Sequence, residues 1–447
     1  MSDTSVPGGT PLDHVATGEP LALDDDQIPP AERGSRPDAS AGESSRFISV
    51  LTGILGGSAM MSLLAVVLAL VVGAVLIAMT NPAVQASAGY FFSRPSDLIA
   101  AVGSAVGGGY LALIRGGLFD YSAETFALEI KPLLNSLGVA TPLIAAGLGI
   151  ALGFRAGMFN IGGQGQMLIG GSLAGLIGFA LPLPPGIHII VAVLAGLVGG
   201  ALWAGIVGVL KARTGAHEVI VTIMLNYIAF YFIDYLLHTP VLQAPGSSDP
   251  KTPAELPTAI FPPLFGGTYL LNIGFLLVIV ATFITWYLLD RSSLGFKFRA
   301  VGQNPKAARV AGIDVKRMYV YVMVISGALV GFAGVYQVLG QTTTGFTNGF
   351  DAGIGFNAIT VALLGRSRPW GVFGAGILFG IFQSGGYTMQ AAQGIDIDIV
   401  TVIQSIIVLF IAAPPLVRAI FRLPIPGKTR TASVRRTRVT QKETIAS

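Results

Sequence analysis

The sequence predicts an all-α polytopic membrane protein with about ten transmembrane helices. Of its 447 residues, 52% are hydrophobic and only 11% are charged, and the mean hydropathy is +0.71. Uncharged apolar runs of about 20 residues, which match the thickness of the bilayer core, recur along the chain. This composition excludes a soluble enzyme. The chain contains no Cys, which excludes disulfides, thiolate nucleophiles and cysteine-ligated metal sites.

The two ends of the chain differ from its apolar middle. Residues 1–50 are rich in Pro, Gly, Ser and acidic residues, so we expect a disordered tail there, and they lack the pattern of a secretory signal. Residues 415–447 carry a strip of Lys and Arg that anionic membrane lipids attract. The transmembrane domain is therefore expected at 51–414, with one long basic loop at 290–317. The net charge of +4 fits cytoplasmic loops better than a nucleic-acid partner.

Apolar windows give ten helices between the two tails. In order, they are Ser58–Met79, Pro132–Gly153, Gln164–Phe179, Ile187–Val209, Val219–Leu237, Leu270–Leu289, Met318–Leu339, Ala352–Leu364, Val372–Tyr387 and Asp398–Ala413.

The stretch Ser96–Ile114 is also apolar, but its interpretation differs. It contains three consecutive glycines, Gly107 to Gly109, and has Arg94 and Arg115 at its flanks. We therefore expect it to lie at the membrane interface or outside the membrane. Counting it as an eleventh span would reverse the orientation of the first helix relative to the others.

Loop charges predict the orientation of the helices. Basic residues stand after helices two, four, six and eight, and the loop at 290–317 has the most of them. The connections 180–186, 341–350 and 388–397 contain no Lys or Arg. Because cytoplasmic loops carry the excess of positive charge, both termini are expected to be cytoplasmic.

Helices two and seven are followed by similar segments. Each leads through glycines to a Phe-Asn pair, Phe159-Asn160 or Phe356-Asn357, beside the mouth of a short helix. The predicted topology puts the two segments on opposite sides of the membrane, which indicates an inverted repeat of helices two to five against helices seven to ten. In transport proteins, short helices interrupted by glycine at corresponding positions of two halves indicate the substrate path.

Polar side chains near these segments are candidates for that path. An unpaired polar group in hydrocarbon costs several kcal/mol, so these groups either line a polar path or hydrogen-bond between helices. Amides and hydroxyls suit an uncharged polar solute, such as a sugar or nucleoside, better than an amino acid. The predicted path residues are Asn160, Gln164, Gln166, Thr222, Asn226 and Asn357.

The basic loop at 290–317 contains a short helix with both ends encoded. Asn304 is a good N-cap, Pro305 fits the first helical position, and Gly312 suits a left-handed C-terminal cap. Such a helix on the cytoplasmic face either docks into a soluble partner or lies at the membrane interface. The residues concerned are Asn304, Pro305, Ala307, Ala308, Arg309 and Gly312.

Four segments together carry a family resemblance: Phe159–Gln166, Glu218–Tyr227, Gly302–Ile313 and Ala362–Gly365. They resemble permease subunits of ATP-binding-cassette (ABC) importers, in the simple-sugar and nucleoside branch of the ribose and branched-chain amino-acid permeases. The resemblance runs from the first helix to the tenth and leaves out the acidic tail. It implies a second permease subunit, a cytoplasmic ABC ATPase and an extracellular substrate-binding lipoprotein. It also implies that the loop helix is a coupling helix that sits in a groove of the ATPase.

Motifs for other chemistry are missing from the sequence. The triplet Gly427-Lys428-Thr429 ends like a phosphate-binding loop, but Arg422 occupies the position of the required upstream glycine. The four histidines lie in separate segments without metal-ligand spacing. We therefore expect no enzyme activity in this chain, no metal and no cofactor, and ATP hydrolysis in a partner.

The sequence thus predicts a bacterial plasma-membrane permease subunit that imports a nucleoside or simple sugar. The alternative is a secondary transporter driven by an ion gradient, which also uses broken helices but usually needs ionisable residues within the membrane. The candidate for such a role is Asp234, near the outer end of the fifth helix.

Overall fold

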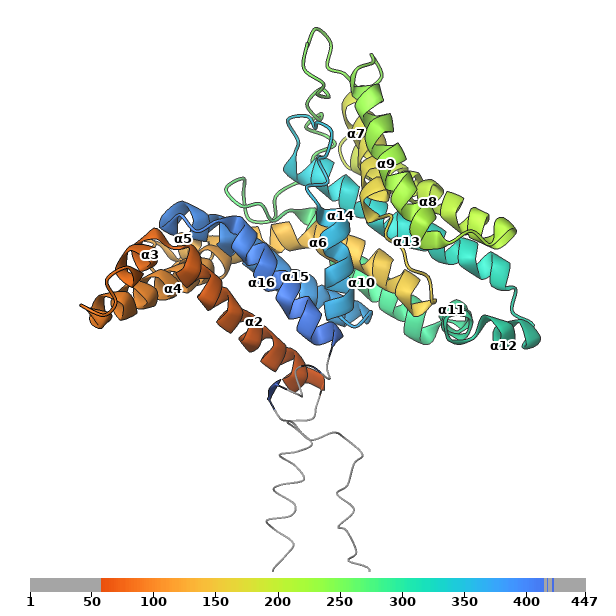
Figure 1. Ribbon diagram of the computed structural model, residues 1–447. Coiled ribbons are helices and arrows are strands. Elements are labelled where there is room, and N and C mark those ends of the chain that lie inside the picture. The colour runs from red at the N-terminus through yellow and green to blue at the C-terminus, as the bar shows by residue number, and fades with distance from the viewer. Residues whose placement is uncertain (1–57, 414–415, 417–419, 422–447) are drawn as a thin grey trace, which may run out of the picture. The chain divides into compact units, whose positions relative to one another are not determined.

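The computed structural model describes residues 58–413, 416 and 420–421 of the chain (Figure 1). The acidic tail predicted at 1–50 and nearly all of the basic tail predicted at 415–447 lie outside the described residues. The described part is helical, and its β pairing is limited to two isolated bridges, one of them between Lys251 and Thr347. The predicted all-α class is therefore confirmed for this part.

Each of the ten predicted apolar windows forms a helix, with ends within a few residues of those expected. Met318–Leu339 corresponds to an α-helix that continues as a π-helix. The ten elements are α2 Ser58–Thr80, α6 Lys131–Arg155, α7 Gly163–Ala180, α8 Ile187–Thr214, α9 Glu218–Leu237, α10 Ile273–Arg291, α13 Val315–Tyr336 with η2 Gln337–Gln341, α14 Ile354–Leu364, α15 Pro369–Gln393 and α16 Ile397–Ala412.

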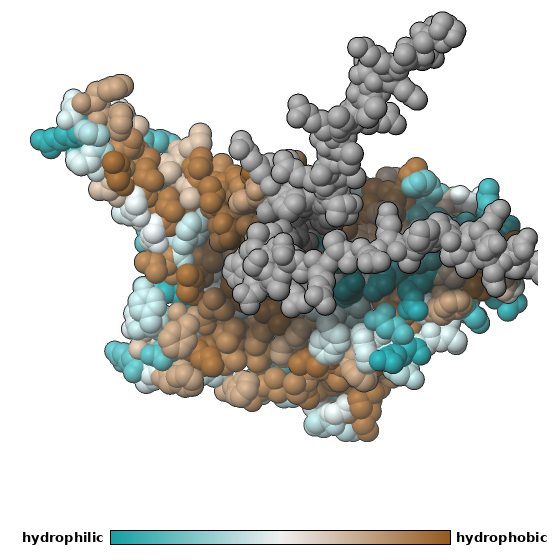
Figure 2. Space-filling model, turned by 90° about the horizontal axis from the view of Figure 1, so that it is seen from below, coloured by the Kyte–Doolittle hydropathy of each residue, from teal (hydrophilic) through white to brown (hydrophobic). Residues whose placement is uncertain are grey.

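Seven helices of the described part are long and apolar enough to cross a membrane: α2, α4, α6, α8, α9, α10 and α13 with its π-helical end. Helices α14 and α16 are apolar but shorter. Large apolar side chains are exposed on α8, α9 and α10, among them Leu202, Tyr231 and Ile284. Figure 2 shows apolar residues over much of the face seen from below. Such surfaces suit contact with lipid, so the chain is a multi-pass membrane protein.

The stretch Ser96–Ile114, expected at the membrane interface or outside the membrane, is helical, and its place relative to the membrane stays a prediction. This stretch belongs to a continuous helix, α4 (Pro95–Gly117), which lies between the short helices α3 (Pro82–Ala88) and α5 (Phe126–Glu129). Its last turns pack closely on α15, where Gly108 lies beside Gln393 and Gly117 beside Ile381. Of the three consecutive glycines, Gly108 and Gly109 lie against side chains of other segments and Gly107 faces open space, whereas Gly117 meets the backbone of Ile381. Helix α4 therefore runs antiparallel to α15 and ends beside its middle.

Glycines also set the packing of the central helices. Helix α13 crosses α8 where Gly327 meets Gly200 backbone to backbone, and α6 packs on α15 where Gly380 meets Ser136 and Ala140. Close approach at small residues is how membrane helices associate without a hydrophobic driving force between them.

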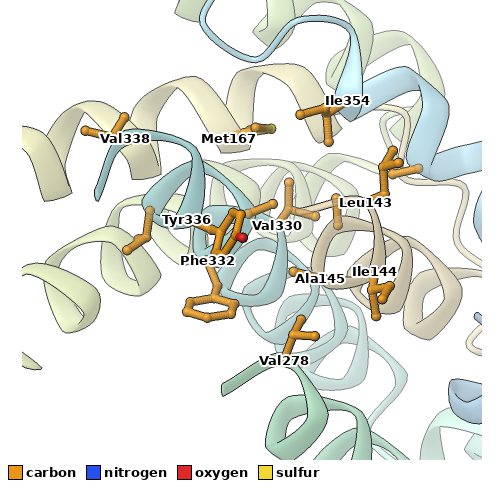
Figure 3. Close-up of a cluster of buried hydrophobic side chains, with 14 of the residues drawn as sticks. Leu143, Ile144, Ala145, Met167, Val278, Val330, Phe332, Tyr336, Val338 and Ile354 are labelled. Carbon is orange, nitrogen blue, oxygen red and sulfur yellow. The ribbon is translucent and has the colours of Figure 1, made fainter. Parts of the chain in front are cut away.

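The main core lies where α6, α7, α10, α13 and α14 converge. Figure 3 shows side chains from all five helices directed toward one another, with Tyr336 and Phe332 of α13 among them. A second cluster joins α2, α4, α16 and the outer part of α15, and a third joins the ends of α6, α8 and α13 to the loop helices. The first core holds the helix breaks described next.

Candidate substrate path and coupling surface

Helices α7 and α14 start against each other. A Cβ atom on Gly163 would lie 2.6 Å from the carbonyl oxygen of Gly355, and a Cβ atom on Gly355 would overlap the backbone of Gln164. Only glycine permits this approach. Because the N-terminus of a helix carries a partial positive charge, the two helices bring two such ends to one place.

Five of the six predicted path residues lie at or beside the start of α7. Asn160, which is fully buried, makes four side-chain hydrogen bonds: two with the amide of Gln166 (3.0 and 2.9 Å), one donated to Ser326 Oγ (2.9 Å) and one accepted from the backbone N–H of Gly162 (2.9 Å). Ser326 Oγ in turn donates to the carbonyl oxygen of Gly149, 2.7 Å away. Asn160 and Ser326 therefore link the segment that precedes α7 to α13 and α6.

Asn226 holds the same helix start from α9. Its Oδ1 accepts the backbone N–H of Gly165 (2.9 Å), and its Nδ2 donates to the carbonyl oxygen of Ile161 (2.9 Å). The N–H groups of a first helical turn have no partner within the helix, so Asn226 satisfies one of them from another helix. Thr222, one turn earlier, donates only to its own helix, at Glu218 and Val219.

Gln164 and Asn357 make none of these hydrogen bonds. Gln164 is half-buried and donates to Oδ1 of Asp351 at 3.4 Å, across the junction of α7 and α14. Asn357 lies one turn into α14, half-buried, and its amide makes no hydrogen bond to the described part of the chain. Whether the solute contacts any of the six side chains stays a prediction.

A large cavity lies elsewhere, between α4, α6, α15 and the end of α13. Its volume is about 760 Å³, and none of the six predicted residues lines it. Uncharged polar side chains from three elements, α6, η2 and α15, face it together with apolar ones such as Val139 and Ile354. The polar set is Asn135, Gln337, Gln341, Gln383, Ser384, Tyr387 and Thr388.

Two glutamines reach this cavity from the π-helix η2. Gln337 is more than nine-tenths buried, and its Oε1 has no hydrogen-bond partner in the described part of the chain. Gln341 donates to the carbonyl oxygen of Gly138 at 3.1 Å. Single turns of π-helix occur frequently at functional sites, and a buried acceptor without a partner is costly unless water or a ligand satisfies it. The sequence signal was two glutamines four residues apart at the end of an apolar helix.

Charged groups lie in the cavity lining and near the end of α9. Arg115 pairs with Asp120 at 3.1 Å, and both line the cavity, as does Lys131. Hydrogen bonds from Ser122, chiefly, hold the pKa of Asp120 below its usual range. Asp234, the candidate for ion coupling, accepts a hydrogen bond from Asn348 at 3.2 Å.

Glu255, in the long segment between α9 and α10, is buried against Gly175 and Gly178 of α7. Neither of its carboxyl oxygens has a hydrogen-bond partner among the described residues. Burial raises the pKa of Glu255 to about 8. The described residues contain no group of three or more potential metal ligands.

The predicted loop helix is present as α12 (Pro305–Val310) and follows a second helix, α11 (Ser293–Gln303). Asn304 Oδ1 accepts the backbone N–H groups of Lys306 and Ala307 at 3.0 and 3.1 Å, as an N-cap does. Gly312 has a φ of +81°. These features confirm both predicted caps.

One face of α12 is free of the protein body. Ala308 is buried, whereas Pro305, Ala307 and Arg309 are exposed, and 91% of Val310 is exposed. An exposed apolar side chain among basic ones on a rigid helix can dock into a soluble partner.

A backbone contact links α11 and α12 to the segment that precedes α7. A Cβ atom on Gly302, at the end of α11, would lie 2.6 Å from the carbonyl oxygen of Arg155 and 2.9 Å from the backbone N of Gly157. The Nε of Arg155 donates to the carbonyl oxygen of Ser367, before α15, at 3.0 Å. Displacement of α11 and α12 would therefore press on the segment that carries Asn160.

Polar backbone and broken helices at the centre of an apolar helical protein are tolerated where they line a cavity or a solute pathway, so the fold and site define a membrane transport protein. Residues 133–412, more than half of the chain, match the family described as the branched-chain amino acid transport system permease component, and the chain belongs to this family.

Relatives within this class are ABC transporter permeases. The chain is 35% identical to a guanosine ABC transporter permease protein of Bacillus subtilis over 71% of this chain and 88% of that protein. It is 33% identical to a glucose ABC transporter permease protein of Haloferax volcanii over 69% and 83% of the two chains. It is 35% identical to a nucleoside ABC transporter permease protein of Lactococcus lactis over 65% and 81%. No solved structure matches the chain.

The family assignment decides three of the sequence predictions. The chain is a translocation subunit in the plasma membrane and is not itself an enzyme. Permeases of this kind work with a partner ATPase and a substrate-binding protein. The ATP-driven interpretation therefore stands over the ion-gradient alternative, for which Asp234 was the candidate.

Proposed function

We propose that this permease imports a nucleoside through the 760 Å³ cavity. The observation that carries the proposal is the buried, unpartnered Oε1 of Gln337 in a cavity lined by amides and hydroxyls, with Arg115, Asp120 and Lys131 also in its lining. Amides and hydroxyls hydrogen-bond an uncharged solute without a counter-ion, and Tyr387 offers a ring for a base. Two relatives of about 35% identity are named for guanosine and nucleosides.

A simple sugar is the second candidate. The relative from Haloferax volcanii is named for glucose, and the same amides and hydroxyls would bind sugar hydroxyls. The apolar residues of the cavity, Val139 and Ile354 among them, favour the nucleoside because a base presents a flat apolar face.

The topology that we propose has ten spans, cytoplasmic termini and an inverted repeat of α6–α9 against α13–α16. Three features support it. Helix α4 ends beside the middle of α15. We infer that the chain enters the membrane at α4 from the outer side and returns to that side without crossing. In the proposed repeat, α6 corresponds to α13 and α15 corresponds to α8. The contact between α6 and α15 therefore has its counterpart in the contact between α13 and α8. The starts of α7 and α14, which correspond in the repeat, meet each other.

In the proposed mechanism, the ATPase receives α12 through Asn304, Pro305, Ala307, Ala308, Arg309 and Gly312. ATP-driven movement of α12 passes through Gly302 and Gly157 to the start of α7, and the two halves rock around the cavity. Gln164 and Asn357, both half-buried, remain proposed path residues beside the two helix starts. A second permease subunit and an extracellular lipoprotein complete the proposed importer.

The test is uptake of labelled guanosine and glucose by the complete transporter carrying Gln337→Ala. We expect the KM for the transported solute to rise about threefold to tenfold, the equivalent of one neutral hydrogen bond, and the melting temperature reports separately on the packing lost with this buried side chain. Gln390→Ala, an exposed glutamine of α15 outside the cavity, is the matched control. Equal KM values for wild type and Gln337→Ala would contradict the cavity assignment.

A further inference from the structure

A second polar cavity, of about 440 Å³, lies at the end of the molecule that carries the basic loops. It is formed by the last residue of α6, the last turns of α10 and the start of α15. Two arginines and one aspartate line it, together with two tryptophans. The residues are Arg155, Trp286, Asp290, Arg368 and Trp370. None of them lines the larger cavity.

The local charge of this cavity is positive. The carboxylate of Asp290 lies 3.9 Å from Nη2 of Arg155 and 3.7 Å from Nη1 of Arg299, so two guanidinium groups share one carboxylate beyond hydrogen-bonding distance. The guanidinium of Arg291 lies 5.7 Å from the ring centre of Trp286 and adds a further positive charge.

Arg368 faces this cavity as an exposed side chain at the turn before α15. The first backbone N–H groups of α15 lie beside it, at the positive end of that helix. The cavity therefore offers an anion several donors and at least one guanidinium that Asp290 does not neutralise.

The surroundings of the cavity are those of a membrane interface. Tryptophans concentrate at the depth of the lipid headgroups, and two of the three tryptophans in the chain, Trp286 and Trp370, line this cavity. Next to Trp286, helix α10 exposes Phe283, Ile284 and Tyr287, each more than half exposed. A ligand with a negative head and apolar chains fits both surfaces at once.

We propose that this cavity binds the phosphate of an anionic phospholipid. Arg368 and Arg155 contact the phosphate, the two indole rings lie at the level of the glycerol, and the acyl chains follow the exposed side of α10. A free phosphate ion has the same charge chemistry but makes no use of the apolar surface, and the test below separates the two sources.

Tryptophan fluorescence gives a direct measurement. In the Trp203→Phe variant of the full chain, the two remaining tryptophans are those of the cavity. We would reconstitute this variant in phosphatidylcholine vesicles that contain a minor fraction of brominated phosphatidylglycerol or of brominated phosphatidylcholine. We expect stronger quenching by the brominated phosphatidylglycerol. Arg368→Gln should lower this preference about fivefold, the contribution of one basic residue near an anionic surface.

Three comparisons make the test decisive. Arg213→Gln, an exposed arginine near the end of α8 outside the cavity, should keep the preference, and Arg368→Lys, which retains the charge, should keep most of it. Equal quenching by the two brominated lipids would overturn the proposal. So would an Arg368→Gln variant whose fluorescence shows the same lipid preference as that of the parent. Displacement of phosphatidylglycerol by inorganic phosphate in detergent would instead identify a site for the free ion.

Discussion

At the scale of single residues, most buried polar groups near the helix breaks serve one another. Asn160, Gln166 and Ser326 satisfy each other's donors and acceptors, and Asn226 satisfies a backbone N–H of α7. Oε1 of Gln337 and Oδ2 of Asp351 are different, because these buried oxygens have no hydrogen-bond partner among the described residues. Of the two, the oxygen of Gln337 lies in the cavity through which we propose that the solute passes.

The holding role of Asn226 can be measured. Asn226→Ala leaves the N–H of Gly165 and the carbonyl of Ile161 without partners, so the free energy of unfolding should fall by about 1–3 kcal/mol. Thr222→Val, whose hydroxyl bonds only to its own helix, is the neighbouring control and should cost less than about 1 kcal/mol. Melting temperatures in detergent compare the two, and equal losses would argue against the cap.

Glu255 predicts a pH dependence of stability. Burial raises its pKa to about 8 in the folded protein, against the usual value of about 4.3 in an unfolded chain. Between these two values the folded state keeps a proton that the unfolded state has lost, so this group lowers stability as pH rises. Glu255→Gln should therefore raise the melting temperature at pH near 8 by about 2–4 °C and change it little at pH near 4. A gain independent of pH would contradict this account.

At the scale of elements, the caps of α12 determine whether it is a rigid contact. Asn304→Ala removes the acceptor for two backbone N–H groups and should cost about 1 kcal/mol of helix stability. We expect less solute transported per ATP hydrolysed, with an intact membrane domain, whereas Asn304→Asp keeps the acceptor and the coupling. Uptake and hydrolysis measured together on the complete transporter decide the matter. If both variants transported as much solute per ATP hydrolysed as the wild type, α12 would have no part in the coupling.

At the scale of the whole molecule, glycine contacts set the distance between the central helices. A Cβ atom on Gly327 of α13 would overlap the backbone of Gly200 in α8, whereas one on Gly374 of α15 would meet nothing within 4 Å. Gly327→Val should cost at least about 1–3 kcal/mol through overpacking, seen as a lower yield of monodisperse protein and a lower melting temperature. Gly374→Ala should be neutral. Equal behaviour of the two variants would show that the close α8–α13 contact does not stabilise the protein.

The sequence predicted the local features of this molecule well. The ten helices and the two caps of α12 follow from apolar runs, from Asn304 and from Gly312, because these signals lie within a few neighbouring residues. The path residues were chosen in the same way, as amides close to a helix break. Their partners could not be predicted, since Ser326 lies 166 residues from Asn160 in the chain.

The sequence by itself determined the membrane class, the order of the helices and the family, because composition and short motifs are properties of neighbouring residues. The tertiary structure alone decided which helices meet. It gave α4 its contact with α15, brought Gln337 and Gln341 to a cavity shared with α6 and α15, and placed Arg368 beside Arg155. Each of these contacts joins segments that lie far apart in the sequence. A local sequence pattern does not indicate which distant segments pack together.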